Sequence, residues 1–216
     1  MAGPGLLVPQ FEDHEPPKIT CPADISVGCS VELLVPVTFS VTATDNRDPA
    51  PTVICTPPSG SGFARGTTNV NCTATDSSGN TASCSFRVTR APLSFTGFLP
   101  PVGGADATGG SFATPLKTFK LKSTIPVKFA AACDGSAVLT GVHRLQVIRY
   151  SEETTPEEPI DASPQDAATT GNEFRLVDGQ WHFNLDTKAT GLSVGKWQII
   201  AVLSDGSQHS AWIQIK

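Results

Sequence analysis

Short runs of alternating apolar and polar residues cover most of the chain. The clearest lies between Val37 and Thr44, where valine, phenylalanine and alanine alternate with serine and threonine. Because successive side chains of a strand point to opposite faces, this alternation predicts a strand with one buried face. The other runs of this kind are 53–55, 70–74, 82–88, 119–121, 125–129, 145–147, 181–185, 197–203 and 211–215. Turn-forming residues separate the runs, so the pattern predicts an all-β fold with two tandem immunoglobulin-like antiparallel β-sandwich domains.

Interruptions of the alternation set the expected domain boundaries. Residues 1–16 are rich in Pro and Gly without periodicity, and we interpret them as an N-terminal arm or linker that is disordered or docks on a partner. The first sandwich is predicted over 17–91 and the second over 112–216, with a Pro/Gly-containing junction at 92–111. Within the second sandwich, residues 151–172 lack an apolar face and predict a solvated acidic insertion, with partner binding as the alternative.

Composition and charge narrow the function classes. The 216 residues contain 19 Gly and 18 Pro and only 16% charged residues, which excludes a long helical bundle or coiled coil. The net charge of -5 argues against nucleic acid as the partner. Most of the excess acidity falls in one stretch without Lys or Arg, which contains Glu152, Glu153, Glu157, Glu158, Asp161, Asp166 and Glu173.

Three features bear on location. No apolar run approaches the roughly 18 residues of a membrane span, so no membrane insertion is predicted. Residues 1–10 lack the basic and long apolar regions of a secretory signal, so the chain does not look like the precursor of a conventionally secreted protein. Six cysteines nevertheless indicate maturation in an oxidising place. Either a signal has been replaced, or the protein reaches the outside by another route, such as on a virus particle released by lysis.

Several motifs of the first predicted domain occur in the order of a known module. They are Pro17–Pro22 (PKITCP), Ala43–Asn46 (ATDN), Cys55–Phe63 (CTPPSGSGF), Arg65–Asp76 (RGTTNVNCTATD) and Ser78–Phe86 (SGNTASCSF). Together they resemble the hyalin repeat (HYR) module over about residues 16 to 90. The resemblance implies an extracellular, immunoglobulin-like adhesion or spacer module without catalytic activity. It also implies disulfides between Cys55 and Cys72 and between Cys21 and Cys84, whereas Cys29 departs from the family pattern and could compete with Cys21 for Cys84.

The second predicted domain resembles another module. The motifs are Gly97–Val102 (GFLPPV), Ser123–Phe129 (STIPVKF) and Leu203–Ala211 (LSDGSQHSA). They are similar to the PxKF-type module of bacterial surface proteins, which often follows repeats of the first kind. The resemblance implies a bacterial surface protein.

The cysteines allow more than one chemistry. Cys55, Cys72 and Cys84 share the inward parity of their strands, where a thiol either forms a bridge or behaves as a small apolar group. Cys133 stands alone in the second domain and is either a buried free thiol or paired with Cys29 or with another chain. No C-x-x-C pair occurs, which disfavours zinc.

Catalysis and metal binding have weak support. The histidines His14, His143, His182 and His209 are scattered and lie in no nucleophile motif, so no enzyme activity is predicted. Asp45 with Asp48, and Asp76 with Asn80, offer hard oxygen ligands in two loops. These residue types also form turns, and neither loop matches a twelve-residue calcium pattern. No cofactor is therefore predicted, with calcium as the alternative.

The three tryptophans differ in parity, that is, in which face of their predicted strand they occupy. Trp181 and Trp197 share the parity of Phe183 and Ile199, which places them in the core, whereas Trp212 opposes its apolar neighbours and is expected at the surface.

We therefore predict a non-catalytic structural or adhesive module on an outer surface, either as a virion decoration or tail-associated protein or on a bacterial cell. Its partners would be proteins of a surface assembly, with the N-terminal arm as a candidate contact. The alternative is a carbohydrate-binding module of a secreted bacterial protein, in which Trp212 stacks on a sugar.

Overall fold

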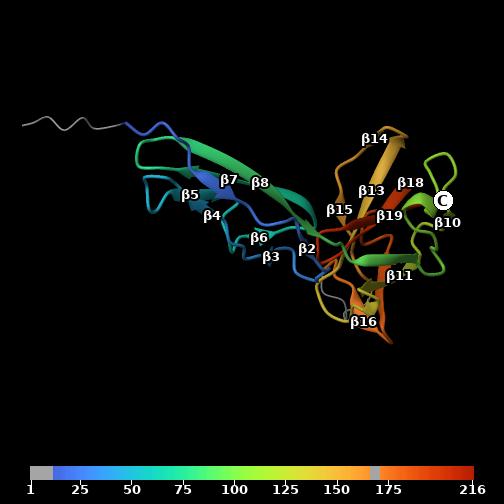
Figure 1. The fold of residues 1–216 in the computed structure, drawn as a ribbon. Coiled ribbons are helices and arrows are strands. Elements are labelled where there is room, and N and C mark those ends of the chain that lie inside the picture. The colour runs from blue at the N-terminus through green and yellow to red at the C-terminus, as the bar shows by residue number, and fades with distance from the viewer. Residues whose placement is uncertain (1–11, 166–170) are drawn as a thin grey trace, which may run out of the picture. The chain divides into compact units, whose positions relative to one another are not determined.

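The computed structural model describes residues 12–165 and 171–216 (Figure 1). Within these ranges the secondary structure is β, apart from a single 3₁₀ turn, η1 (Asp106–Thr108). The all-β class is therefore confirmed. The chain divides into two compact units. The first unit contains the residues up to 27, 36–63 and 67–89, and the second contains 28–35, 64–66 and 90–216.

The first unit is an immunoglobulin-like sandwich of short strands. Its strands are β1 (Lys18–Thr20), β2 (Ile25–Val27), β4 (Thr42–Thr44), β5 (Thr52–Thr56), β7 (Gly66–Thr75) and β8 (Thr81–Arg90), and β3 (Val35–Pro36) pairs with β6 (Gly62–Phe63). One sheet has the order β2-β8-β7-β5 and another pairs β1 with β4. The apolar faces meet in a small core around Val70, Phe86 and Val88. Inward-facing residues therefore follow the predicted parity.

The strand predicted over 37–44 is shorter in the structure. Only Thr42–Thr44 joins a ladder, although burial alternates along the whole run. Residues 37–41 bond instead to the loop before β6. The Gly60 amide donates to the Val37 carbonyl at 2.8 Å, and the Ser59 hydroxyl bonds the Phe39 backbone. Alternation reports which face is buried, but it does not report whether a partner strand is present.

The second unit is a larger sandwich. Its strands are β9 (Ser94–Phe98), β10 (Lys117–Phe119), β11 (Thr124–Cys133), β12 (Ser136–Ala137), β13 (Arg144–Glu152), β14 (Thr155–Pro156), β15 (Ile160–Asp161), β16 (Arg175–Val177), β17 (Gln180–Asp186), β18 (Gly195–Val202) and β19 (Gln208–Ile215). One sheet runs β10-β19-β18-β13-β14, with β15 also on β13, and the other runs β12-β11-β17-β16, with β9 on β11. Pairing is antiparallel except between β10 and β19. Trp181 and Trp197 are buried in the core, with exposed fractions of 4% and 3%.

The stretch predicted as a junction, 92–111, belongs to the second unit. It contributes β9 and the buried side chains of Leu93, Phe98 and Val102. Apolar residues spaced among Pro and Gly therefore pack into a core here, although the composition resembles a linker.

The acidic insertion at 151–172 is only partly as predicted. Residues 151–161 are exposed, but β14 and β15 both pair with β13, and Ala162 is 3% exposed in the core. The insertion thus extends the sheet by edge strands. Asp166 lies outside the described residues.

No helix in the described part of the chain is long and apolar enough to cross a membrane.

Candidate functional site

All six cysteines form disulfides. Cys21 pairs with Cys84 and Cys55 with Cys72, the pairs that the resemblance to the HYR module implied. Cys55 and Cys72 lie directly opposite each other on β5 and β7. The third bridge joins Cys29 to Cys133, so Cys29 does not compete for Cys84 and Cys133 is not a free thiol.

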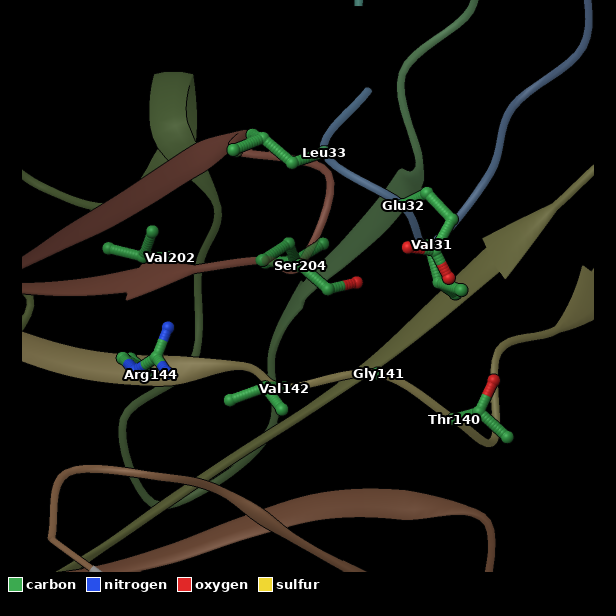
Figure 2. Close-up of a pocket in the computed structure, with 11 residues that line it drawn as sticks. Val31, Glu32, Leu33, Thr140, Gly141, Val142, Arg144, Val202 and Ser204 are labelled. Atoms are coloured by element: carbon green, nitrogen blue, oxygen red, sulfur yellow. The ribbon is translucent and has the colours of Figure 1, made fainter. Parts of the chain in front are cut away.

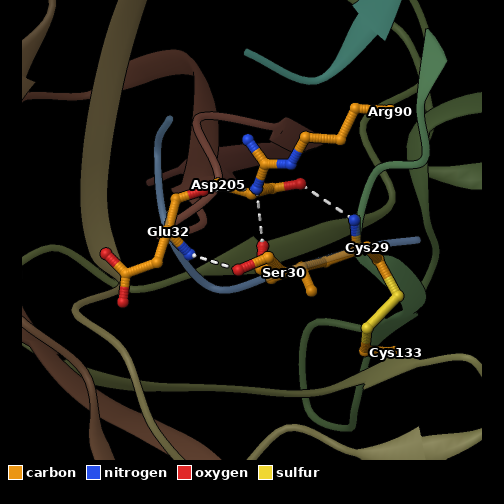
Figure 3. Close-up of a disulfide and its surroundings, with 7 residues drawn as sticks. Cys29, Ser30, Glu32, Arg90, Cys133 and Asp205 are labelled. Atoms are coloured by element: carbon orange, nitrogen blue, oxygen red, sulfur yellow. Dashed lines mark hydrogen bonds between the residues drawn. A yellow bond between two sulfur atoms is a disulfide. The ribbon is translucent and has the colours of Figure 1, made fainter. Parts of the chain in front are cut away.

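The Cys29–Cys133 bridge is one half of a clamp on residues 28–35 (Figure 3). The other half is Arg90, whose side chain is 1% exposed. Its guanidinium donates to the carbonyl of Leu33 at 2.9 Å, to that of Ser30 at 3.0 Å and to that of Glu32. A planar guanidinium can serve several carbonyls at once, which an ammonium on a flexible stem does less well. The clamp explains why this segment belongs to the second unit.

A buried carboxylate stabilises the turn beside the clamp. Asp205 is 1% exposed and accepts hydrogen bonds from the Leu93 amide at 2.8 Å and from the Ser207 hydroxyl at 2.6 Å. Burial alone would raise the pKa of Asp205. The bonds from Ser207 and the Leu93 amide outweigh burial and hold its pKa below the usual value.

The clamped segment forms one wall of a pocket of about 590 Å³ (Figure 2). Val31 and Leu33 face residues 140–144 and 202–206 of the same unit. The lining is mostly apolar, and the Arg144 guanidinium is paired with Glu173 at 3.2 Å. The pocket is therefore a mostly apolar depression whose charged lining side chains are Glu32 and the ion-paired Arg144.

His143 lies between Val142 and Arg144, two residues that line this pocket. The ring is fully buried, and its Nδ1 accepts a hydrogen bond from the Ser204 amide at 3.1 Å. It also packs edge-on against Trp181, with ring centroids 4.2 Å apart. Burial lowers the pKa of His143 from 6.5 to about 4, and the nearby Asp205 carboxylate opposes this only in part. The neutral imidazole is therefore the folded form near neutral pH.

Acidification is expected to destabilise the second unit through His143. The unfolded chain binds a proton at this residue below about pH 6.5, whereas the folded chain resists protonation until the pH approaches about 4. Between these values the free energy of unfolding should fall by up to about 3 kcal/mol. Urea unfolding followed by tryptophan fluorescence across this range measures the change. In His143→Asn, whose amide oxygen can still accept from Ser204, this part of the pH dependence should disappear, and an unchanged slope would contradict the assignment.

Trp212 lies in an aromatic cluster on the outer face of the large sheet. Its ring contacts Tyr150 with centroids 4.5 Å apart and meets Phe112 edge-on at 5.9 Å. The Lys196 ammonium lies 4.2 Å from the centre of the Phe112 ring, and the Tyr150 hydroxyl donates to Gln198 at 3.1 Å. These five residues, which we call the aromatic platform, are each partly exposed. Of them, only Trp212 was predicted from the sequence.

The acidic loops of the first unit also come together. Carboxylate oxygens of Asp13, Asp45 and Asp76 lie within 4.8 Å of one another. Asp48 and Asn80, the other predicted ligands, instead make hydrogen bonds that tie the loops. Asp48 accepts from the Ser77 amide at 2.8 Å, and the Asn80 amide donates to Asp76 at 2.9 Å.

Turn chemistry accounts for much of this cluster. Asp45 Oδ1 accepts from the amides of Asp48 and Arg47, and these bonds lower the pKa of the Asp45 carboxyl. Asp13 adds a residue of the predicted arm, since its carbonyl accepts from Asn80 at 3.0 Å. The end of the arm is thus bonded to the first unit, while residues 1–11 lie outside the described part of the chain.

The calcium alternative at Asp45, Asp48, Asp76 and Asn80 stays a prediction, and Asp13 joins Asp45 and Asp76 as the carboxylates that lie close together. If the site has the affinity typical of extracellular calcium modules, about 10 mM calcium should raise the free energy of unfolding of the first unit by about 1–3 kcal/mol over EDTA. Differential scanning calorimetry measures the shift. Asp45→Asn should remove it and Asp178→Asn, in the other unit, should not. Equal melting temperatures in calcium and EDTA would exclude the site.

His209 is held between a carboxylate and an aromatic ring. His209 bonds Asp106 through Nδ1 at 2.8 Å, and Phe95 stacks on its ring at 4.2 Å. No hydroxyl or thiol of the described chain hydrogen-bonds this ring. The same Asp106 accepts from the Ser210 amide at 3.0 Å, so the pair fixes the start of β19.

The comparison with protein families agrees with the fold of the first unit. Residues 12–90 match the HYR domain family. HYR is an adhesion-associated, immunoglobulin-like and non-catalytic type of extracellular module, and its range here includes the end of the predicted arm. No family match extends the comparison to a PxKF-type module, and a search of curated proteins found no match.

Similar solved structures include the following two. One is the Bacteroides ovatus mixed-linkage glucan utilization locus protein SGBP-B in complex with a mixed-linkage heptasaccharide, at 14% identity and a TM-score of 0.29. The match covers 94% of this chain but only 48% of that one, so the chain spans about half its length. The other is the tandem Ig repeats of Dlar, at 13% identity and a TM-score of 0.27, covering 93% of this chain and 98% of that one.

Proposed function

We propose that the protein is a non-catalytic structural or adhesive module displayed on an outer surface. The observation that carries the proposal is the HYR match over residues 12–90. The oxidised state of all six cysteines supports it, because disulfides persist in extracellular and virion settings and are rare in the cytosol. Disulfide-tied sheets would hold loop tips and edge strands in fixed positions for a partner.

The surface is either that of a bacterial cell or that of a virion. The resemblance of the second unit to a PxKF-type module supports a bacterial cell surface. The proposal assigns attachment or assembly to protein contacts, including contacts of the N-terminal arm, and requires no cofactor.

Surface labelling of the native producer tests this function. A membrane-impermeant amine reagent applied to intact cells or purified particles should label the protein, and alkylation without prior reduction should find no free thiol. The fraction that carries the label distinguishes a cell from a particle. Protein that is protected in intact cells and alkylated at Cys55, Cys72 and Cys84 would overturn the proposal.

A further inference from the structure

The aromatic platform lies on a sheet face whose composition is defined by the strand register. Four cross-strand rows run over β13, β18 and β19 on this outer face. They are Tyr150–Lys196–Gln214, Ile148–Gln198–Trp212, Gln146–Ile200–Ser210 and Arg144–Val202–Gln208. The first two rows, which contain four of the five platform residues, carry amides, one phenol hydroxyl, apolar side chains and one ammonium, and no carboxylate. The charged groups next to the other two rows are Asp161, which accepts from Gln146 at 3.0 Å, and Arg144, which is paired with Glu173.

The rings of the platform are held in place before any ligand binds. Tyr150 on β13 and Trp212 on β19 are separated by the whole of β18, yet their rings meet above it. The loop that carries Phe112 runs along β19, because the backbone amide of Trp212 donates to the Gly109 carbonyl at 2.7 Å and the Trp212 carbonyl accepts from the Leu116 amide at 2.9 Å. A Cβ at Gly109 would lie 2.7 Å from the Ser210 carbonyl, so this loop fits tightly against the strand. Fixed rings lose little conformational entropy when a ligand is bound.

The polar groups around the rings suit hydroxyl groups. The bond from Tyr150 uses the carbonyl oxygen of the Gln198 amide and leaves its two N–H donors for an acceptor on a ligand. Gln214 lies one row away, next to Lys196. Amides both donate and accept, which matches a sugar hydroxyl, and an aromatic face packs against the apolar C–H face of a pyranose ring.

Charge favours a neutral ligand over an acidic one. Lys196 is the only cation in the first two rows, and its ammonium already lies over the Phe112 ring. A surface that binds polyanions needs several cations side by side. We therefore propose that the aromatic platform, centred on Trp212 and Gln198, is a binding site for a neutral oligosaccharide. The inference rests on the proposed surface display and gives it a ligand class.

Affinity electrophoresis of the full chain tests the site. The gels contain a soluble neutral polysaccharide (hydroxyethylcellulose, galactomannan, laminarin or starch) or, for comparison, the polyanion alginate. We expect at least one neutral polysaccharide to retard the protein and alginate not to. Trp212→Ala should weaken that retardation at least about tenfold, and Trp212→Phe, which keeps a flat ring, should retain most of it. The melting temperature of each variant shows that the second unit is still folded.

Matched variants keep the test decisive. Gln198→Leu removes the amide but not the ring contacts and should also weaken retardation. Leu139→Ala truncates a 51% exposed apolar side chain outside the platform and should leave retardation unchanged. The site is overturned if no neutral polysaccharide retards the protein, if only alginate does, or if folded Trp212→Ala and Gln198→Leu bind like the parent. None of these results would alter the surface-labelling outcome, so the two proposals fail separately.

Discussion

Replacing Cys29 and Cys133 together by alanine is expected to lower the free energy of unfolding of the second unit by about 4 kcal/mol. The two cysteines are 104 residues apart in sequence, so their bridge removes much conformational entropy from the unfolded chain. Loss of the bridge also removes one half of the clamp, so that only Arg90 still holds residues 28–35. Unfolding in guanidinium chloride, followed by tryptophan fluorescence, measures this change in the free energy of unfolding, because Trp181, Trp197 and Trp212 all lie in the second unit.

The matched control for this variant is the double replacement of Cys55 and Cys72. That bridge closes a shorter loop, with a sequence separation of 17, and lies in the first unit, which contains no tryptophan. Its removal should destabilise the first unit and leave the fluorescence transition in place. A fluorescence transition that is unmoved by the loss of Cys29 and Cys133 would show that the bridge does not stabilise the second unit.

Arg90→Leu is expected to cost about 3 kcal/mol or more. The leucine removes the donors to three carbonyls, and a hydrogen bond to a charged group contributes about 1.5–3 kcal/mol. Segment 28–35 should then exchange its amide hydrogens much faster, which hydrogen-exchange mass spectrometry measures peptide by peptide. Arg90→Lys keeps the charge but lacks the planar guanidinium, so its free energy of unfolding should lie between those of the parent protein and Arg90→Leu.

Arg87→Leu provides the control for Arg90. Arg87 lies on the same strand and is exposed, so its loss should change the free energy of unfolding by no more than about 0.5 kcal/mol. If Arg90→Leu and Arg87→Leu changed the free energy of unfolding equally, the hydrogen bonds of Arg90 would contribute no more than an exposed arginine does.

Much of the fold follows from the sequence because the signal is local. The alternation at 70–74, 82–88 and 211–215 identifies β7, β8 and β19, and parity alone separates buried Trp181 from partly exposed Trp212. The strand at 37–44 is overestimated for the same reason, since a half-buried extended segment alternates whether or not it joins a ladder.

The contacts that define the clamp and the platform carry no local signal. Arg90 appears in the sequence as an ordinary residue at the end of a strand, and its burial depends on carbonyls 57 to 60 residues away. Tyr150 reaches Trp212 only through the order of strands in the sheet, and Phe112 reaches it through a loop that is hydrogen-bonded along β19. Asp13 joins Asp45 and Asp76 because the described end of the arm is hydrogen-bonded to Asn80, in the loop that follows Asp76. Each arrangement combines distant segments, which periodicity does not report.

The Cys29–Cys133 bridge has a topological consequence for a protein exposed to proteases. A single backbone cut anywhere between residues 30 and 132 leaves both fragments covalently joined, because one fragment retains Cys29 and the other retains Cys133. Loop tips are the usual places for such nicks. A nick at the 57–60 loop would thus be visible only after reduction, as two bands in place of one, while the intact and nicked forms would migrate together without a reductant.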